Sequence, residues 1–196
     1  MAEVLLFHHA GGLTPGVHAF ADRLRAAGHV VHTPDLYDGA MFDDVHAGVA
    51  NGEAIGQEVL AARARAAAAG IAGPLVVAGM SLGCAMATGV LLERPDVVGA
   101  LYLYGAVTPR WWDAEWPSGV PAQAHVAAHD EWREPEVEEE FAALGHAVFV
   151  YEDGGHLFLD VDRPDHSEES ADEAWPRILA FLDGVDSAGG GPRPHG

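Results

Sequence analysis

The stretch VVAGMSLGCAMA, residues 76–87, joins a short apolar run to a segment of small, helix-forming residues. It places Ser81 between Gly79 and Gly83 in a Gly-x-Ser-x-Gly pattern. Between a strand and a helix, this pattern is typical of a nucleophile elbow, a strained turn that exposes the serine hydroxyl. Small residues are needed on both sides because the strand and helix backbones approach closely at such a turn. The alternative interpretation is that Ser81 only caps the helix that follows it.

Apolar runs and helical patterns alternate on both sides of this stretch. Strands are predicted at residues 3–7, 29–35, 73–79, 97–106, 121–130 and 146–153, and helices at 16–29, 52–70, 81–93, 134–145 and 170–185. The strands are short and continuously apolar, which is typical of strands that are covered on both faces. The pattern therefore predicts an α/β fold, with a mostly parallel open sheet of about six strands and helices on both faces.

The same alternation of strands and helices indicates how the chain divides into domains. We expect one domain over residues 1–185, with an irregular segment at 36–51 inside it. Residues 186–196 are rich in glycine and proline, and this composition predicts a disordered tail.

Composition limits the classes of partner. The 196 residues carry a formal net charge of −20, which disfavours nucleic acid and anionic lipid as partners. The chain has 1 cysteine, so an internal disulfide framework is excluded. The first residues, MAEVLLFHHAGG, lack the pattern of a secretory signal, and no apolar run is long enough for a membrane span. We therefore expect a cytoplasmic monomer or homodimer that acts on a small molecule.

Polar residues at the predicted strand ends supply candidates for a catalytic triad. In hydrolases with a nucleophile elbow, the order along the chain is serine, acid, histidine. His156 lies in a glycine-containing loop after the sixth strand, where an imidazole can reach the serine. Asp130 follows the fifth strand and is the expected acid, with Glu131 and Glu134 as rivals. The predicted triad is Ser81, Asp130 and His156.

The loop after the first strand, FHHAGG, is expected to complete the site. An oxyanion hole needs two backbone N–H groups, one from the residue after the nucleophile and one from this loop. Leu82 and Ala10 are the predicted donors. His8 and His9 also suggest a metal site, but adjacent strand residues point to opposite faces and no ligand cluster accompanies them. We expect no metal and no cofactor, and we expect His8 to hold the loop by hydrogen bonds.

Aromatic side chains supply candidates for a substrate pocket. Trp111 and Trp112 follow the fourth strand, and we expect them to line the pocket together with His9. The alternative is that these tryptophans, with Trp116, pack their loop onto the core. Cys84 lies one helical turn past Ser81 and is interpreted as a small buried apolar residue.

Several stretches together resemble the dienelactone hydrolase family of α/β-hydrolases. They are VLLFHHAGGLTPGVHAFADRLRAAGHVVHTPDLYDG (4–39), VVAGMSLGCAMA (76–87), LYLYGAV (101–107), PAQAHVAAHDEW (121–132) and VFVYEDGGHLF (148–158). They occur in the family's order and cover most of residues 3–160. The resemblance implies a compact α/β-hydrolase fold without a large cap domain, and a triad of Ser81, Asp130 and His156.

The sequence departs from the family pattern at two places. Typical dienelactone hydrolases have cysteine at the nucleophile position, where this chain has Ser81. They also hold the substrate carboxylate with arginines and control the nucleophile with a glutamate in the loop after the first strand. Here that loop reads His8-His9-Ala10, and Asp160 rather than arginine lies just past His156. The resemblance therefore transfers the fold and the triad but not the dienelactone substrate.

These observations predict a serine hydrolase that cleaves a small carboxylic ester or lactone through an acyl-enzyme. Its activity should fall in acid, because a protonated His156 cannot accept the serine proton. One alternative is a thioesterase, or an acyl-transfer or cyclisation enzyme, that uses the same triad. A second alternative is a hydrolase-fold protein that binds a ligand without catalysis, because a fold alone does not establish an activity.

Overall fold

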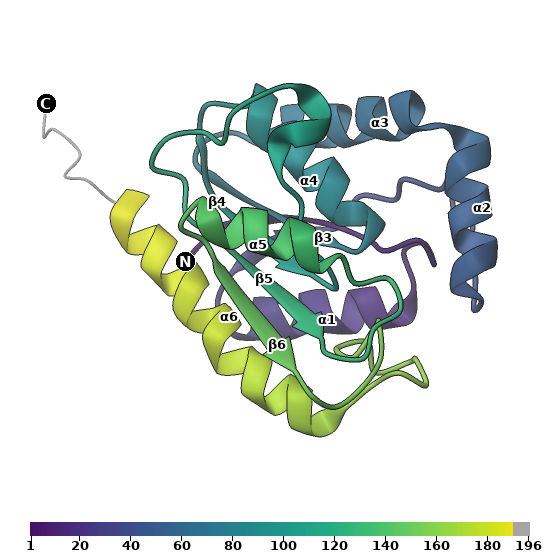
Figure 1. Ribbon diagram of the computed structural model, residues 1–196. Helices are drawn as coiled ribbons and strands as arrows, with labels where there is room; N and C mark the ends of the chain where they lie inside the picture. The colour runs from purple at the N-terminus through teal and green to yellow at the C-terminus, as the bar shows by residue number, and fades with distance from the viewer. Residues whose placement is uncertain (190–196) are drawn as a thin grey trace, which may run out of the picture.

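A computed structural model describes residues 1–189 of the chain and contains one six-stranded sheet (Figure 1). The strands are β1 (Glu3–Phe7), β2 (Val30–His32), β3 (Leu75–Met80), β4 (Val97–Leu103), β5 (Ala122–Ala127) and β6 (Ala147–Tyr151). They lie in the order β2-β1-β3-β4-β5-β6, and every neighbouring pair is parallel. The predicted α/β fold with about six strands is confirmed, and the sheet is parallel throughout.

Helices cover both faces of this sheet. The helices are α1 (Pro15–Ala26), α2 (Val45–Ile55), α3 (Gln57–Ala69), α4 (Leu82–Glu93), α5 (Pro135–Ala143) and α6 (Glu168–Gly189), with a short 3₁₀ helix, η1, at Pro109–Trp112. One buried apolar cluster joins the sheet to α1 and α6, and a second joins it to α3, α4 and α5. The apolar character of the strands follows from this covering, because side chains on both faces are buried.

The segment between β2 and α3 differs from the prediction. A helix was expected over residues 52–70, after an irregular segment at 36–51. The structure instead has two helices, α2 and α3, which meet at Gly56. Gly56 has φ of +91°, a conformation that breaks the helical path and that glycine adopts without strain. Asp44 begins α2 earlier than expected, because its side chain accepts a hydrogen bond from the His46 N–H.

The last helix extends beyond its predicted bounds. α6 begins at Glu168 and continues to Gly189, and Pro176 lies inside it. Pro176 is exposed, and the carbonyl that it leaves unpaired can be hydrated. The first four residues of the tail predicted over 186–196 are helical, and residues 190–196 lie outside the described part of the chain.

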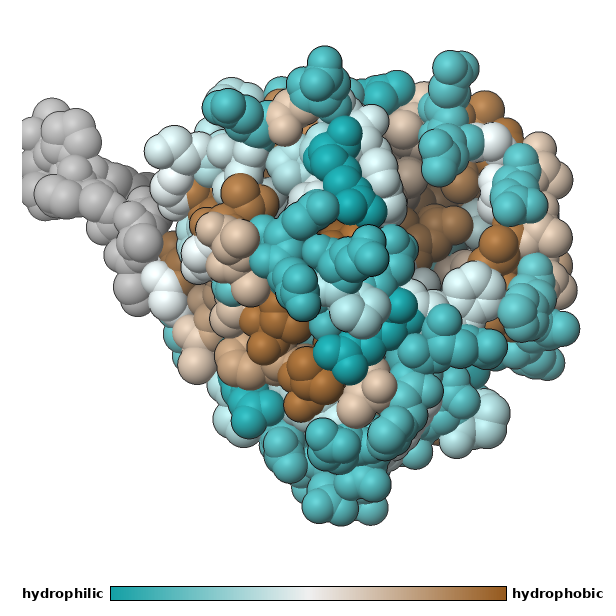
Figure 2. Space-filling view, viewed as in Figure 1, coloured by the Kyte–Doolittle hydropathy of each residue, from teal (hydrophilic) through white to brown (hydrophobic). Residues whose placement is uncertain are grey.

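The surface seen in Figure 2 is mostly hydrophilic, as the charge of −20 requires. The same view shows an apolar hollow next to the position of α2. None of the helices within residues 1–189 is long and apolar enough to cross a membrane.

Candidate active site

Ser81 occupies the turn between β3 and α4. Its backbone has φ of +51° and ψ of −114°, a combination that a non-glycine residue adopts only when the surroundings enforce it. The position is the N-cap of α4, but the side chain makes no capping hydrogen bond. The hydroxyl is therefore not used to satisfy the helix terminus, in contrast to the alternative interpretation of Ser81 as a cap.

The two glycines around Ser81 are needed for close backbone packing. A Cβ on Gly79 would lie 2.3 Å from the carbonyl of Gly83, and a Cβ on Gly83 would lie 2.3 Å from the carbonyl oxygen of Phe7. Both contacts are with backbone atoms, which cannot rotate away. β1 also pairs with β3 so that Phe7 lies opposite Gly79. The loop after β1 and the turn at Ser81 therefore leave the sheet side by side.

A continuous chain of hydrogen bonds links the three predicted triad residues. The Ser81 Oγ lies 2.8 Å from the His156 Nε2. The His156 Nδ1 lies 2.7 Å from the Asp130 Oδ2. Asp130 follows β5, and His156 lies in the loop after β6, so the fold brings together residues that are 75 positions apart in the sequence. This geometry allows the imidazole to take a proton from the serine while the carboxylate fixes the ring.

The surroundings of His156 restrict its position further. The side chain of Asp130 is 1% exposed and that of His156 is 7% exposed. The second carboxylate oxygen of Asp130 accepts a hydrogen bond of 2.8 Å from the Trp132 N–H. The ring centroids of Tyr104 and Trp132 lie 6.0 and 6.1 Å from that of His156. Two aromatic rings therefore lie near the imidazole.

The predicted oxyanion donors lie at the same edge of the sheet. Leu82 is the first residue of α4, and Ala10 lies in the loop after β1. Within residues 1–189, neither backbone N–H donates a hydrogen bond to another group. Both donors are thus available for a ligand, and the N-terminus of α4 adds a favourable field for negative charge.

Two buried histidines hold this loop. The His8 Nδ1 donates to the His9 carbonyl at 2.8 Å, and its Nε2 accepts from the Leu36 N–H at 3.0 Å. Burial lowers the pKa of His8, in agreement with a neutral ring that uses one nitrogen as donor and one as acceptor. This arrangement agrees with the expectation that His8 secures the loop.

His9 lies in the interior, although we expected it at the substrate pocket. Its side chain is 1% exposed, and its Nε2 lies 3.0 Å from the Asp160 Oδ2. Its Nδ1 accepts a hydrogen bond from the Gly11 N–H at 2.9 Å. No group of three or more metal-ligating side chains occurs within the described residues.

Cys84 is fully buried in the first turns of α4. Its Sγ lies 3.2 Å from the Gly79 carbonyl oxygen, and burial raises the pKa of the thiol to about 12. A reactive cysteine needs its thiolate form, which this site disfavours. Cys84 therefore acts as a small core residue.

The predicted pocket tryptophans lie along the β4–β5 connection. Trp111 and Trp112 contact each other at 6.3 Å between ring centroids, and the Trp112 indole lies beside Gly89 of α4. Both are exposed, at 56% and 38%, and neither has a recorded ring contact with His156 among the described residues.

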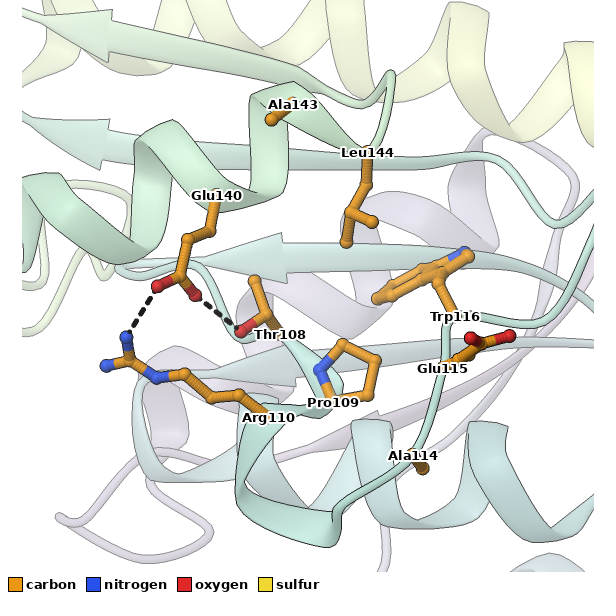
Figure 3. Close-up of a pocket in the computed structure, with 9 residues that line it drawn as sticks. All are labelled: Thr108, Pro109, Arg110, Ala114, Glu115, Trp116, Glu140, Ala143 and Leu144. Atoms are coloured by element: carbon orange, nitrogen blue, oxygen red, sulfur yellow. Dashed lines mark hydrogen bonds and ion pairs between the residues drawn. The ribbon is translucent and has the colours of Figure 1, made fainter.

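Trp116 behaves differently and packs its loop. Its ring contacts Phe141 and its Nε1 donates to the Val120 carbonyl. It also lines an open pocket of about 550 Å³ between this loop and α5, where Arg110 pairs with Glu140 (Figure 3). None of the triad residues lines this pocket.

Sequence reasoning missed two features of the site. The first is the partnership of His9 with Asp160, which lie 151 positions apart in the sequence. The second is the position of Trp132 beside His156, although its place two residues after Asp130 is a signal that could have found it. The first has no local signal, because only the fold brings the two residues together.

Comparisons with known proteins agree with this geometry. The sequence model of the family described as "Dienelactone hydrolase family" matches residues 1–185. No curated protein matches the chain in sequence.

Three solved structures illustrate the structural likeness. A putative dienelactone hydrolase from Klebsiella pneumoniae is 19% identical, with a TM-score of 0.74 over 93% of this chain and 87% of that one. A dienelactone hydrolase-like promiscuous phosphotriesterase from metagenomic libraries is 16% identical, with a TM-score of 0.74 over 94% and 87% of the two chains. A putative α/β hydrolase from Xanthomonas campestris is 23% identical, with a TM-score of 0.66 over 94% and 99%.

At these identities the solved structures establish the fold alone, while the family model covers nearly the whole chain. The family and enzyme class expected from the sequence are thereby confirmed. The chain belongs to the dienelactone hydrolase family and is a hydrolase of the ester-cleaving type.

Proposed function

We propose that the chain is a serine esterase or lactonase that acts on small substrates through an acyl-enzyme. Ser81 is the nucleophile, His156 the general base and acid, and Asp130 the residue that orients His156. The observation that carries this proposal is the unbroken hydrogen-bond chain from Ser81 to His156 to Asp130, at 2.8 and 2.7 Å. The strained backbone of Ser81 supports it, because a capping serine has no need of this conformation.

Acylation begins when the Ser81 Oγ attacks the carbonyl carbon of the ester. The hydroxyl proton passes to the His156 Nε2, and Asp130 stabilises the imidazolium through the Nδ1–H. The carbonyl oxygen becomes an oxyanion that accepts hydrogen bonds from the N–H groups of Ala10 and Leu82. When the intermediate collapses, the bond to the alcohol oxygen breaks and His156 returns the proton to the departing alcohol.

Deacylation repeats these steps with water. The neutral His156 takes a proton from water, which attacks the acyl-serine carbonyl. The oxyanion again lies at Ala10 and Leu82. Collapse releases the carboxylic acid and returns the proton to the Ser81 Oγ. For a lactone, the alcohol and the acid are two ends of one product.

The test is covalent labelling with a fluorophosphonate, followed by mass spectrometry of the intact protein and its peptides. The expected result is one adduct on the wild type, mapped to Ser81, and no adduct on Ser81→Ala. Ser118→Ala is a matched control, because Ser118 lies in an exposed loop outside the site. Absence of an adduct on the folded wild type would overturn the proposal.

A substrate panel then separates oxygen esters from the thioester alternative. An aryl ester, a simple lactone and a thioester with matched acyl groups are compared by kcat/KM. We expect the oxygen esters to be preferred. A strong preference for the thioester would keep the triad but replace the proposed substrate class.

A further inference from the structure

A second buried histidine–aspartate pair lies beside the triad. We propose that His9 and Asp160 position the oxyanion loop, defined as residues 9–12, so that the Ala10 N–H points at the reacting carbonyl. This inference rests on the proposed function, because it assigns a role in the same reaction. His9 and Asp160 are positioning residues and do not touch the substrate.

The ring of His9 folds back onto its own loop. Its Nδ1 accepts a hydrogen bond from the Gly11 N–H at 2.9 Å, and its carbonyl accepts one from the Gly12 N–H at 3.0 Å. A Cβ on Gly11 would lie 2.6 Å from the ring, so the loop has little room to shift. Ala10 lies between the residues that these bonds connect, so the direction of its N–H depends on them.

Asp160 selects the tautomer of His9 that this loop needs. The His9 Nε2 donates to the Asp160 carboxylate, which leaves Nδ1 without a proton and able to accept from Gly11. The other tautomer, or a protonated ring, would set two N–H donors against each other at Gly11. Burial lowers the pKa of His9 and so favours the neutral ring, despite the opposing influence of Asp160.

Asp160 is itself held in place. Its carboxylate accepts from the Asp162 N–H at 3.0 Å and lies against the first turn of α1, where a Cβ on Gly16 would come within 1.6 Å of it. Burial would raise the pKa of Asp160, but the bonds from His9 and Asp162 hold it below its ordinary value. The carboxylate is therefore a charged, fixed acceptor.

Arg163 closes the network around the loop. Its guanidinium donates to the carbonyls of Phe42 and Asp43 at 2.9 and 2.7 Å. The Phe42 N–H in turn donates to the Gly11 carbonyl at 2.9 Å. The Arg163 Nε lies 3.9 Å from the Asp160 carboxylate. Asp160 therefore contacts the oxyanion loop in two ways. It contacts the loop directly through His9, and indirectly through Arg163 and the Phe42 backbone.

The loop after β6 carries both the proposed catalytic base, His156, and the anchor of the oxyanion loop, Asp160. Asp160 lies four positions after His156, and its N–H donates to the Leu157 carbonyl at 2.8 Å. The pair therefore links the segment that bears the base to the segment that bears one oxyanion donor. A displacement of either segment would separate the general base from the hole in which charge develops.

Two substitutions divide the functions of the His9 ring. In His9→Asn, the amide oxygen can replace Nδ1 as acceptor for Gly11, but the bond to Asp160 is lost. In His9→Gln, the amide nitrogen can replace Nε2 as donor to Asp160, but the bond to Gly11 is lost. We expect His9→Gln to be the more stable variant and His9→Asn to be the more active one.

The measurements are kcat, KM, the inhibition constant of an alkylboronic acid and the midpoint of urea unfolding. In His9→Gln, we expect kcat to fall about 10- to 100-fold with KM within about threefold, because a misdirected oxyanion donor weakens the transition state more than the ground state. The inhibition constant of the boronic acid, which forms a tetrahedral adduct with Ser81, should rise in parallel with the loss of kcat. The matched control is His32→Gln, which makes the same substitution in a histidine–carboxylate pair outside the site, where His32 Nε2 contacts Glu3, and should leave kcat within twofold.

The opposed order of activity and stability is the decisive result. If His9 served only the fold, activity would follow stability and His9→Gln would be the better enzyme; that result would overturn the proposal. Unchanged kcat in both variants would also overturn it. Failure of Ser81 labelling in the wild type would instead reject the proposed function, so the two failures are distinguishable.

Discussion

The two buried histidine–aspartate pairs of this protein contain the same chemical groups but differ in the third partner of the ring. In the pair of His156 and Asp130, the second ring nitrogen faces the hydroxyl of Ser81. In the pair of His9 and Asp160, the second ring nitrogen accepts from the backbone N–H of Gly11. One imidazole is free to accept a proton from a reacting group, while the other is occupied on both sides.

This difference shows that a carboxylate beside a histidine does not by itself indicate catalysis. The carboxylate sets which nitrogen carries the proton, and the group at the other nitrogen decides what the ring does. Next to a hydroxyl, the ring is a candidate base. Next to a backbone N–H, it is an anchor for the chain. The predictions below test the comparison from the largest expected effect to the smallest.

Replacement by asparagine should mainly lower kcat at Asp130 and mainly lower the free energy of unfolding at Asp160. Asp130→Asn should lower kcat by about 10⁴-fold, because an amide no longer favours the tautomer that accepts the Ser81 proton. Its free energy of unfolding should change by only about 1 kcal/mol. Asp160→Asn should lower kcat far less but should cost about 3 kcal/mol of stability, because it leaves buried groups around it without their charged partner.

Steady-state kinetics and urea unfolding of both variants check this prediction. The comparison between the two pairs would fail if Asp160→Asn lost as much kcat as Asp130→Asn. It would also fail if Asp130→Asn were the more destabilised of the two.

A glycine in α1 tests the second pair without altering either of its members. Gly16→Ala would place a Cβ 1.6 Å from the Asp160 Oδ1, and this buried carboxylate is held by hydrogen bonds from His9 and Asp162. We expect a loss of about 3 kcal/mol of stability and a lower kcat. Gly184→Ala is the matched control: it lies in α6, no atom from another segment of residues 1–189 comes within 4 Å of the added Cβ, and it should stabilise by about 0.5–1 kcal/mol.

Thermal or urea unfolding of the two alanine variants distinguishes them. Helix propensity alone predicts that both gain stability. A gain at Gly16 would therefore show that Asp160 is not held against α1 and would remove one support of the second pair.

The sequence allowed prediction of the features that depend on short-range patterns. The alternation of apolar runs and helices predicted the parallel sheet, and the Gly-x-Ser-x-Gly pattern predicted the turn at Ser81. The order of polar residues after the strands pointed to Asp130 and His156; in the structure His156 lies between Ser81 and Asp130 and is hydrogen-bonded to both. The three side chains come together because the carboxyl ends of parallel strands share one edge of the sheet.

Other features depend on contacts that no local pattern encodes. The pairing of His9 with Asp160 requires the loop after β1 to meet the loop after β6, with Gly16 leaving room between them. The break at Gly56 was missed because the residues around it have good helix propensity, and a single glycine is tolerated within many helices. The φ of +91° at Gly56 has no signal in the surrounding sequence.

Another buried histidine, His125, has no carboxylate partner and shows what the two aspartates contribute. The His125 Nδ1 lies 2.7 Å from the Tyr151 hydroxyl, and its Nε2 has no partner within the described residues. Burial lowers the pKa of His125 to about 3. Below about pH 6.5 the unfolded chain therefore binds a proton that the folded protein does not, and stability falls by about 1.4 kcal/mol per pH unit.

The test compares the wild type with His125→Phe by urea unfolding between pH 5 and 8. The contribution of His125 to the free energy of unfolding of the wild type should be fully present above about pH 6.5 and should decline as the pH falls. In the variant, the decline to pH 5 should be smaller by about 2 kcal/mol, whatever the variant's stability at neutral pH. Burial also lowers the pKa of His8 and His9, so a residual slope is expected. An unchanged slope would show that His125 does not stay neutral in the folded protein.

The smallest expected effect concerns Trp132, whose ring lies beside His156. Trp132 is 37% exposed, and its ring lies 6.1 Å from that of His156 and 5.1 Å from that of His46 in α2. The indole of Trp132 therefore lies beside the proposed base, whereas Trp112 lies beside Gly89 along α4. We expect Trp132→Ala to raise the KM of an aryl ester about three- to tenfold, in line with the loss of one aromatic contact.

Trp112→Ala is the matched control, because it removes an indole of similar exposure and should leave KM within twofold. Comparison with an ester of a short alkyl alcohol separates contact with the substrate from disturbance of the triad. Loss of the indole contact should raise KM mainly for the aryl ester. If Trp132→Ala instead lowered kcat equally for both esters, the indole would act by packing near the ring of His156 rather than by contact with the substrate. Trp132 would then, like Asp130, hold His156 in position. The pair of His156 and Asp130 would depend on aromatic packing, whereas the pair of His9 and Asp160 depends on hydrogen bonds to its loop.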